Sequence, residues 1–294
     1  YRMNGPVQFA RTLNLAACTE WSSNCGFQQL RDWHANGRMN QMAAAESIQA
    51  GLNPAFLLLG CIVLFSYTTQ AITGFGSTVI ALALSAHIYT IPQLLPVLVG
   101  LNLPLCLYFV IQHRKSIEST LVFKEILPWM SAGVGVGLVL LASIPVPALK
   151  PMLGILIVIF AVREGIRLMR RTGSMHAMSN AQFRFWTFAS GITHGIYASG
   201  GPLLVYAVSR KNLGASVFRS TMMTIWLFFN FFLIGFYAYE GRWSSQLVEA
   251  IFLLLPLIPL GIYLGEFLHH RISVRAFWFV VQSVLLVSGV SFLV

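Results

Sequence analysis

Charged side chains are scarce in this sequence. Asp, Glu, Lys and Arg make up only 10% of the 294 residues, and 56% are hydrophobic. Soluble domains average about 25% charged residues, so this composition excludes an ordinary soluble domain. Apolar runs of about 20 residues, the length that crosses a bilayer, follow one another from Pro54 to Val294. We therefore expect an all-α polytopic membrane protein.

Acidic residues are scarcer than basic ones. Nine Asp and Glu stand against 19 Lys and Arg, which gives a net charge of +10. The basic residues gather in short loops between apolar runs, at 113–125, 163–184, 210–219 and 269–275. Such loops mark the cytoplasmic side of a membrane protein, whereas a nucleic-acid-binding protein needs a basic face on a folded soluble domain. The charge pattern therefore predicts a bilayer as partner and excludes nucleic acid.

The motifs of several enzyme classes are missing. The sequence has no Gly-x-x-x-x-Gly-Lys-Ser/Thr phosphate loop and no His-Glu-x-x-His metal cluster. His194 and Ser199 resemble a base and a nucleophile, but no carboxylate is in sight to orient the histidine. Of the four cysteines, Cys18 and Cys25 have a spacing that allows a disulfide or a metal site, but no motif supports the metal. We expect no enzyme activity, no cofactor and no metal.

The first 53 residues differ from the rest of the chain. They are polar and mixed, without strong periodicity, and they contain no apolar core of a signal peptide. Met39 or Met42 is a candidate for the natural start. We expect residues 1–53 to form a poorly ordered extension, followed by a first transmembrane repeat at 54–170, a basic cytoplasmic linker at 171–184 and a second repeat at 185–294.

The basic loops also fix a topology. Six apolar runs are read as full spans, and they are Ile91–Gln112, Ile126–Ile144, Met152–Met169, Ser220–Tyr239, Leu247–Leu268 and Ala276–Val294. To keep every basic loop inside, the stretch Phe185–Ser209 must enter and leave the membrane on one side. Ile91–Gln112 then runs inward and its counterpart Ser220–Tyr239 runs outward. We therefore predict two inverted repeats, each a glycine-broken helical hairpin followed by three helices.

The two remaining stretches each contain a glycine-rich interruption. "AITGFGSTVIAL" (71–82) and "YASGGPLLVYAV" (197–208) are apolar, yet glycine and proline are poor material for a helix interior. Broken helices at corresponding places in two inverted halves indicate the binding site of a transporter. Each half-helix after a break begins with free N–H groups and a positive dipole end, which suit an anion. The candidate residues are Gly74, Phe75, Gly76, Ser77, Thr78, Ser199, Gly200, Gly201 and Pro202. The alternative is that the glycines only permit kinks and tight helix packing.

Three further polar residues lie deep in apolar runs, where such residues are candidates for function. His194 is able to hydrogen-bond a substrate or to carry a coupling proton, or else it is a neutral histidine bonded to a helix carbonyl. Asn102 and Asn230 lie in the first full helix of each half, and each amide either faces the site or bridges two helices. Gln70, Thr73 and Thr193 are weaker candidates for the lining.

The segments "TGFGSTVIALAL" and "GITHGIYASGGPLLVYAV" resemble the paired signatures of the sulfite exporter TauE/SafE family. The resemblance covers about residues 54–294 and includes the basic central loop. The first segment has fewer glycines than many members show, and Ser77 stands where another small residue often occurs. The resemblance implies transport of a small anion, such as sulfite, a sulfonate, thiosulfate or a related sulfur or carboxylate compound.

These observations together predict a secondary transporter for a small anion in the cytoplasmic membrane, that of a bacterium, with protons or the membrane potential as the driving force. The alternative is an anion channel or a membrane sensor, because broken helices also build pores. The sequence does not indicate an oligomeric state.

Overall fold

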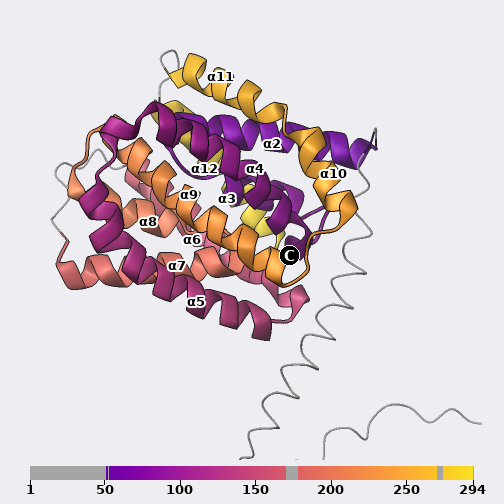
Figure 1. Ribbon diagram of the computed structural model, residues 1–294, viewed down its shortest axis with the longest axis horizontal. Helices are drawn as coiled ribbons and strands as arrows, with labels where there is room; N and C mark the ends of the chain where they lie inside the picture. The colour runs from indigo at the N-terminus through magenta and orange to yellow at the C-terminus, as the bar shows by residue number, and fades with distance from the viewer. Residues whose placement is uncertain (1–50, 52, 170–177, 270–273, 294) are drawn as a thin grey trace, which may run out of the picture. The chain divides into compact units, whose positions relative to one another are not determined.

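The described part of the chain is helical throughout. The computed structural model describes residues 51, 53–169, 178–269 and 274–293, and no strand occurs among them (Figure 1). The first half contains α2 (Pro54–Thr73), α3 (Ser77–Ser85), α4 (Ile91–Gln112), the short turns η1 (Arg114–Ser116) and η2 (Leu121–Ile126, a π-helix), α5 (Leu127–Ser143) and α6 (Val146–Met169). The second half contains α7 (Asn180–Tyr197), α8 (Gly201–Val208), η3 (Ser209–Lys211), α9 (Ala215–Tyr239), α10 (Ser245–Leu254), α11 (Leu257–His269) and α12 (Val274–Ser291).

Six segments among the described residues are long and apolar enough to cross a membrane. They are Pro54–Thr73, Ile91–Gln112, Leu121–Ser143, Val146–Arg163, Ala215–Tyr239 and Ser245–Leu268. Large apolar side chains point outward from these helices, with Val139 69% and Phe231 71% exposed. Because such exposure is costly in water and favourable in hydrocarbon, the chain is a multi-pass membrane protein.

The helix bounds follow local signals. α4 has the predicted bounds, because Thr90 and Gln93 form a capping box and Pro92 stands in the first turn. α7 begins at Asn180, earlier than the predicted start at Phe185, because Ser179 and Gln182 form a second capping box. The predicted span Leu247–Leu268 consists of two helices, which separate at Leu255 and Pro256. The predicted linker 171–184 therefore overlaps the first turn of α7, and residues 170–177 lie outside the described part.

Both predicted interruptions are present. The chain leaves α2 at Gly74 (φ 89°), and Gly76 (φ 100°) precedes α3. These left-handed angles favour glycine, which lacks the Cβ that would clash there. α7 ends at Tyr197, and the next residue, Ala198, has a φ of 49°, which is rare for a residue with a side chain. The arms of the second hairpin are unequal, with 18 residues in α7 and 8 in α8, instead of about a dozen each as the apolar pattern predicts.

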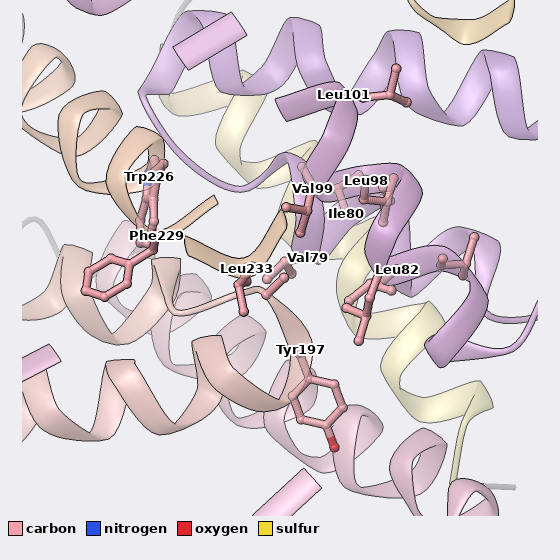
Figure 2. Packing of buried hydrophobic residues seen from close by; sticks show 14 of the residues in the cluster. Val79, Ile80, Leu82, Leu98, Val99, Leu101, Tyr197, Trp226, Phe229 and Leu233 are labelled. Carbon is pink, nitrogen blue, oxygen red and sulfur yellow. The ribbon is translucent and has the colours of Figure 1, made fainter. Parts of the chain in front are cut away.

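Helices of one half pack mainly on helices of the other. The most extensive contacts between halves join α5 to α7, α2 to α11, α6 to α12 and α4 to α9. Figure 1 shows α5 running beside α7, and α2 beside α11. The core lies between these pairs, and in Figure 2 Val79 of the short helix α3 lies among side chains of α4 and α9.

Glycines make two of these contacts possible. A methyl group on Gly133 or Gly137 of α5 would collide with the carbonyl oxygens of Phe188 and Ile192 in α7. A methyl group on Gly265 of α11 would meet Ala71 Cβ of α2 at 2.5 Å. Gly133 and Gly137 of α5 and Gly265 of α11 therefore lie where the backbones of two helices approach closely.

Four pairs of identical residues, with one member of each pair in each half, have the same separation in the sequence. Pro128 and Pro256, Gly133 and Gly261, Gly137 and Gly265, and Asn102 and Asn230 are equally far apart in the sequence. The helices that carry these glycines, α5 and α11, each pack on the long arm of the broken hairpin in the opposite half.

Candidate functional site

The two interruptions lie next to each other. A Cβ atom built on Gly201 would lie 3.5 Å from Phe75 Cδ2 and 3.9 Å from the backbone nitrogen of Gly76. Gly76 immediately precedes α3, and Gly201 is the first residue of α8. The N-terminal ends of the two half-helices therefore face each other, although their positions in the sequence are far apart.

The facing ends present backbone donors. The first N–H groups of any helix have no carbonyl partner within that helix, and they carry the positive end of its dipole. In α3 the groups are those of Ser77 and Thr78, and in α8 they include that of Gly201, while Pro202 has no N–H. Two such ends directed at one place create a positive potential without a charged side chain.

A small cavity of about 20 Å³ lies between the half-helices. Its lining consists of Gln70, Gly76, Thr78, Val79, Asn102, His194, Ala198, Ser199, Gly200, Gly201 and Trp226. A space of this size holds about one water molecule or a group of similar size. The lining combines amide, hydroxyl and ring N–H donors, and it contains no carboxylate.

Gln70 connects the first break to α4. Its side-chain Nε2 donates to Asn102 Oδ1 at 2.8 Å, and its Oε1 accepts from the hydroxyl of Ser77. All three side chains are buried. Gln70 therefore fixes the orientation of the Asn102 amide and of the first residue of α3.

His194 connects the second break to α9. Its Nδ1 accepts a hydrogen bond from the backbone N–H of Gly200 at 3.4 Å. The imidazole stacks on the indole of Trp226, with ring centroids 5.6 Å apart and an interplanar angle of 20°. Because Nδ1 acts as an acceptor, the proton of the neutral ring belongs on Nε2. Nε2 is buried and has no hydrogen-bond partner among the described residues.

The carboxyl end of α2 is neutralised by other groups. Arg219 Nη1 donates to the carbonyl oxygen of Ala71 at 3.2 Å, and Trp226 Nε1 donates to that of Gly74 at 3.1 Å. A cation and an N–H donor at this position compensate the negative end of the α2 dipole. The positive end of α3 on the other side of the break has no such compensation from an acidic side chain in the cavity lining.

A larger, mainly apolar pocket adjoins the cavity. It has a volume of about 60 Å³ and shares Gly76 and Val79 with the small cavity. Phe75 and Pro202 belong to its lining. Its polar side chains are those of Gln282 and Arg163, and the Arg163 guanidinium lies 3.7 Å above the ring of Tyr206. Phe75 packs edge-on against Phe218 at 6.5 Å.

The structure brings most of the sequence-predicted residues together, but it distributes them over different environments. Gly76, Thr78, Asn102, His194, Ser199, Gly200 and Gly201 line the small cavity. Phe75 and Pro202 face the apolar pocket, Ser77 is bonded to Gln70, and the Gly74 carbonyl is bonded to Trp226. Asn230 does not line the cavity, and both polar atoms of its buried amide have no partner among the described residues.

Trp226 is not among the residues predicted from the sequence, and Gln70 is predicted only as a weaker candidate for the lining. Both line the cavity, and each bonds directly to a residue of the first break or of the helix that follows it. For Trp226 a signal was present: an indole inside an apolar span, away from the headgroup region, needs a partner for its N–H.

We compared the chain with known protein families, with proteins of curated description and with solved structures. No protein with a curated description matches this chain, and no solved structure does. The sequence model of the family described as sulfite exporter TauE/SafE matches residues 58–292, which include both breaks and every helix that lines the cavity. This is a family of membrane transporters and not of enzymes. The chain belongs to the sulfite exporter TauE/SafE family.

Proposed function

We propose that the chain is a secondary transporter that moves a small anion across the cytoplasmic membrane, that of a bacterium, and that the cavity between the two breaks is the anion site. The candidate anions are sulfite, thiosulfate, sulfonates and related sulfur or carboxylate compounds. Protons or the membrane potential supply the driving force.

The observation that carries the proposal is the convergence of two helix N-termini on one cavity. The Thr78 and Ser199 hydroxyls, the Asn102 amide and the His194 ring add side-chain donors to the backbone N–H groups. An anion held by such dipoles needs no ionised side chain buried in the membrane, where a full charge is costly. The donor-rich lining without a carboxylate supports an anion rather than a cation as the bound species.

We further propose that the two halves, residues 54–170 and 185–294, form an inverted repeat. The reciprocal packing of α5 on α7 and of α11 on α2 supports it, because each contact becomes the other when the halves are exchanged. The matching positions of Gly133 and Gly261, and of Asn102 and Asn230, support it as well. A site between two such repeats suits alternating access, in which one repeat moves against the other.

A channel is the second candidate. The volume of the small cavity, about 20 Å³, favours a carrier, because a hydrated anion does not pass a space that holds about one water molecule unless the helices move. A carrier saturates with substrate and responds to a gradient of its coupling ion, whereas a pore does neither.

Reconstitution tests the function directly. Purified protein that elutes as a single species is placed in liposomes, and uptake of labelled sulfite, thiosulfate, sulfate, methanesulfonate and acetate is measured with and without an imposed pH gradient or potential. We expect saturable uptake of at least one sulfur anion above that of protein-free liposomes. Folded protein that leaves every anion excluded would rule out the proposed function.

A further inference from the structure

His194 lies beside both the small cavity and the second break. The side chain is 1% exposed and lines the small cavity. It lies four residues before Ala198, the residue that follows α7, and its Nδ1 accepts a hydrogen bond from the N–H of Gly200 in the break itself. The opposite ring nitrogen, Nε2, is buried without a partner among the described residues.

Adding a proton to this ring changes the break. A neutral imidazole has one acceptor nitrogen, and here Gly200 uses it. When Nδ1 takes up a proton it becomes a donor, so the N–H of Gly200 loses its acceptor. Two N–H groups, Nδ1–H and that of Gly200, then need an acceptor in the same place. The oxygens of a bound anion supply it.

The protein itself offers little to stabilise a charged His194. Trp226 and Phe229 of α9 cover its ring, and α5 meets α7 through backbone atoms at Gly191 and Gly195. Ionisable groups on the surrounding elements are engaged in other contacts or carry no negative charge at neutral pH. The carboxylate of Glu125 in η2 pairs with Lys211 at 2.5 Å. The cations are also engaged, because Arg219 of α9 donates to the carbonyl of Ala71, and Arg163 and Arg210 lie over the ring of Tyr206 of α8. The neutral groups are Cys106 of α4, which contacts Gln70, and the buried hydroxyl of Tyr237.

We propose that His194 is the coupling-proton site, and that its proton and the anion bind to the same state of the transporter. This inference rests on the proposed function. A proton from the aqueous phase adds to Nδ1, Gly200 releases its hydrogen bond, and both N–H groups donate to the anion. When the anion leaves, the buried imidazolium loses its counter-charge, the proton returns to water, and Gly200 donates to Nδ1 again. Because coupling is reciprocal, each ligand raises the affinity for the other.

The first half contains a counterpart that does not titrate. Gln70 lies four residues before Gly74, as His194 lies four residues before Ala198. Its amide accepts from Ser77 and donates to Asn102, and it carries no charge at any working pH. The two breaks therefore contribute one proton site between them, and the expected stoichiometry is one proton for each anion.

The test uses His194→Gln, which gives the second break the residue type that Gln70 has at the first break. Glutamine keeps an acceptor for the Gly200 N–H but cannot take up a proton. The matched control is His87→Gln, because His87 bonds Ser291 and does not line the cavity. The probe is methanesulfonate, whose charge is constant over the range of about pH 5–8 in which histidine titrates. Its Kd is measured by calorimetry in detergent solution across that range.

For the wild type and for His87→Gln we expect the Kd to rise with pH, by up to about tenfold per pH unit, because the proton that strengthens binding is lost. For His194→Gln we expect binding whose Kd changes less than about twofold over the same range. A pH-dependent Kd in His194→Gln would overturn the proposal. So would a wild type that binds methanesulfonate with no pH dependence, which would leave the anion site itself intact.

The remaining outcomes separate the two proposals. A wild type that binds none of the sulfur anions at any pH contradicts the proposed function as well. If His194→Gln fails to fold, as size-exclusion chromatography would show, proton uptake by the wild type is measured with an indicator dye in weak buffer while methanesulfonate is added. Uptake approaching one proton per bound anion, accompanied by a change in the ring-nitrogen signals of ¹⁵N-histidine-labelled protein, supports the proposal, and the absence of uptake overturns it.

Discussion

At the scale of single residues, the contact between Gly201 and Phe75 sets how closely the two breaks approach. An added methyl at Gly201 would make an ordinary contact with the Phe75 ring, whereas a leucine would extend further into the small cavity that Gly201 lines. The backbone of α8 needs no special angle here, since the φ of Gly201 is not in the left-handed region. The effect of a substitution at Gly201 therefore depends on the size of the new side chain and not on backbone strain.

We predict that Gly201→Leu abolishes anion uptake while the protein still inserts and purifies as a single species. The leucine prevents an anion from reaching the N–H groups of α8. Uptake in proteoliposomes measures the first effect, and size-exclusion chromatography measures the second. The matched control is Gly235→Leu, since Gly235 is exposed on α9 with nothing within 4 Å. Normal uptake by Gly201→Leu would mean that the break serves only the packing of the helices.

Site residues that depend on backbone conformation were predictable from the sequence. Site residues that depend on how helices pack were less predictable. Glycine and proline in an apolar run locate Gly74, Gly76, Gly200 and Gly201 without any structure. The direction of a side chain on a helix depends on which neighbours the helix meets, so the sequence did not separate Asn102, which lines the cavity, from Asn230, which does not. The role of Gln70 depends on contacts with Asn102 and Ser77 that no local pattern encodes.

At the scale of helices, the contact between α5 and α7 leaves no room for side chains. Gly133, Gly137, Gly191 and Gly195 each face the backbone of the other helix, and a methyl group at any of them would collide with a carbonyl oxygen. Gly135 of α5 lies between the first two and has nothing within 4 Å. The same helix therefore holds glycines that are essential to the contact and one that is not.

We predict that Gly133→Ala and Gly137→Ala each destabilise the protein by about 1–3 kcal/mol, the usual cost of overpacking. The expected fall of the melting temperature is about 2–4 °C for each kcal/mol. Gly135→Ala is the control, and its melting temperature should be unchanged or slightly higher, because alanine favours a helix more than glycine does. Thermal unfolding of detergent-purified protein measures all three. Equal stability of the three variants would contradict the contact described here.

The extent of the helices was predictable to different degrees. α4 agrees with the prediction because caps and proline mark its start. The start of α7 was placed too late, because its first turn (Asn180–Arg184) is polar and a hydrophobicity pattern reads it as loop. The separation of α10 from α11 was missed, because Leu255 and Pro256 stand within one continuous apolar run. Polar first turns and prolines within apolar runs are the features that hydrophobicity alone misreads.

At the scale of the whole molecule, the proposed inverted repeat makes a prediction about sidedness. Ser119, before α5, and Ser245, at the start of α10, occupy similar places in the two halves and are exposed. In a cysteine-free background we expect Ser245→Cys to react with an impermeant maleimide added outside intact cells, and Ser119→Cys to react only after permeabilisation. Both cysteines reacting on the same side would contradict opposite orientations of the halves.

The class of the protein followed from the sequence, because few charges and many apolar runs leave only a membrane fold. The family membership agrees with the resemblance of the two glycine segments, and the matched residues 58–292 leave out all of the first 53 residues. The predicted extension at 1–53 lies largely outside the described residues. The helix pairs that join the halves were not predictable, because contacts between distant segments depend on the surface shape of helices and not on their hydrophobicity.

The reciprocal glycine contacts have a consequence for biosynthesis. When the first half has left the ribosome, the partners of α5 and α2, which are α7 and α11, are not yet made. The first half therefore cannot complete its helix contacts until the second half has been inserted into the bilayer. Two polypeptides cut within residues 171–177 and produced together would be able to reassemble, and two intact chains held side by side at that stage would be able to exchange halves.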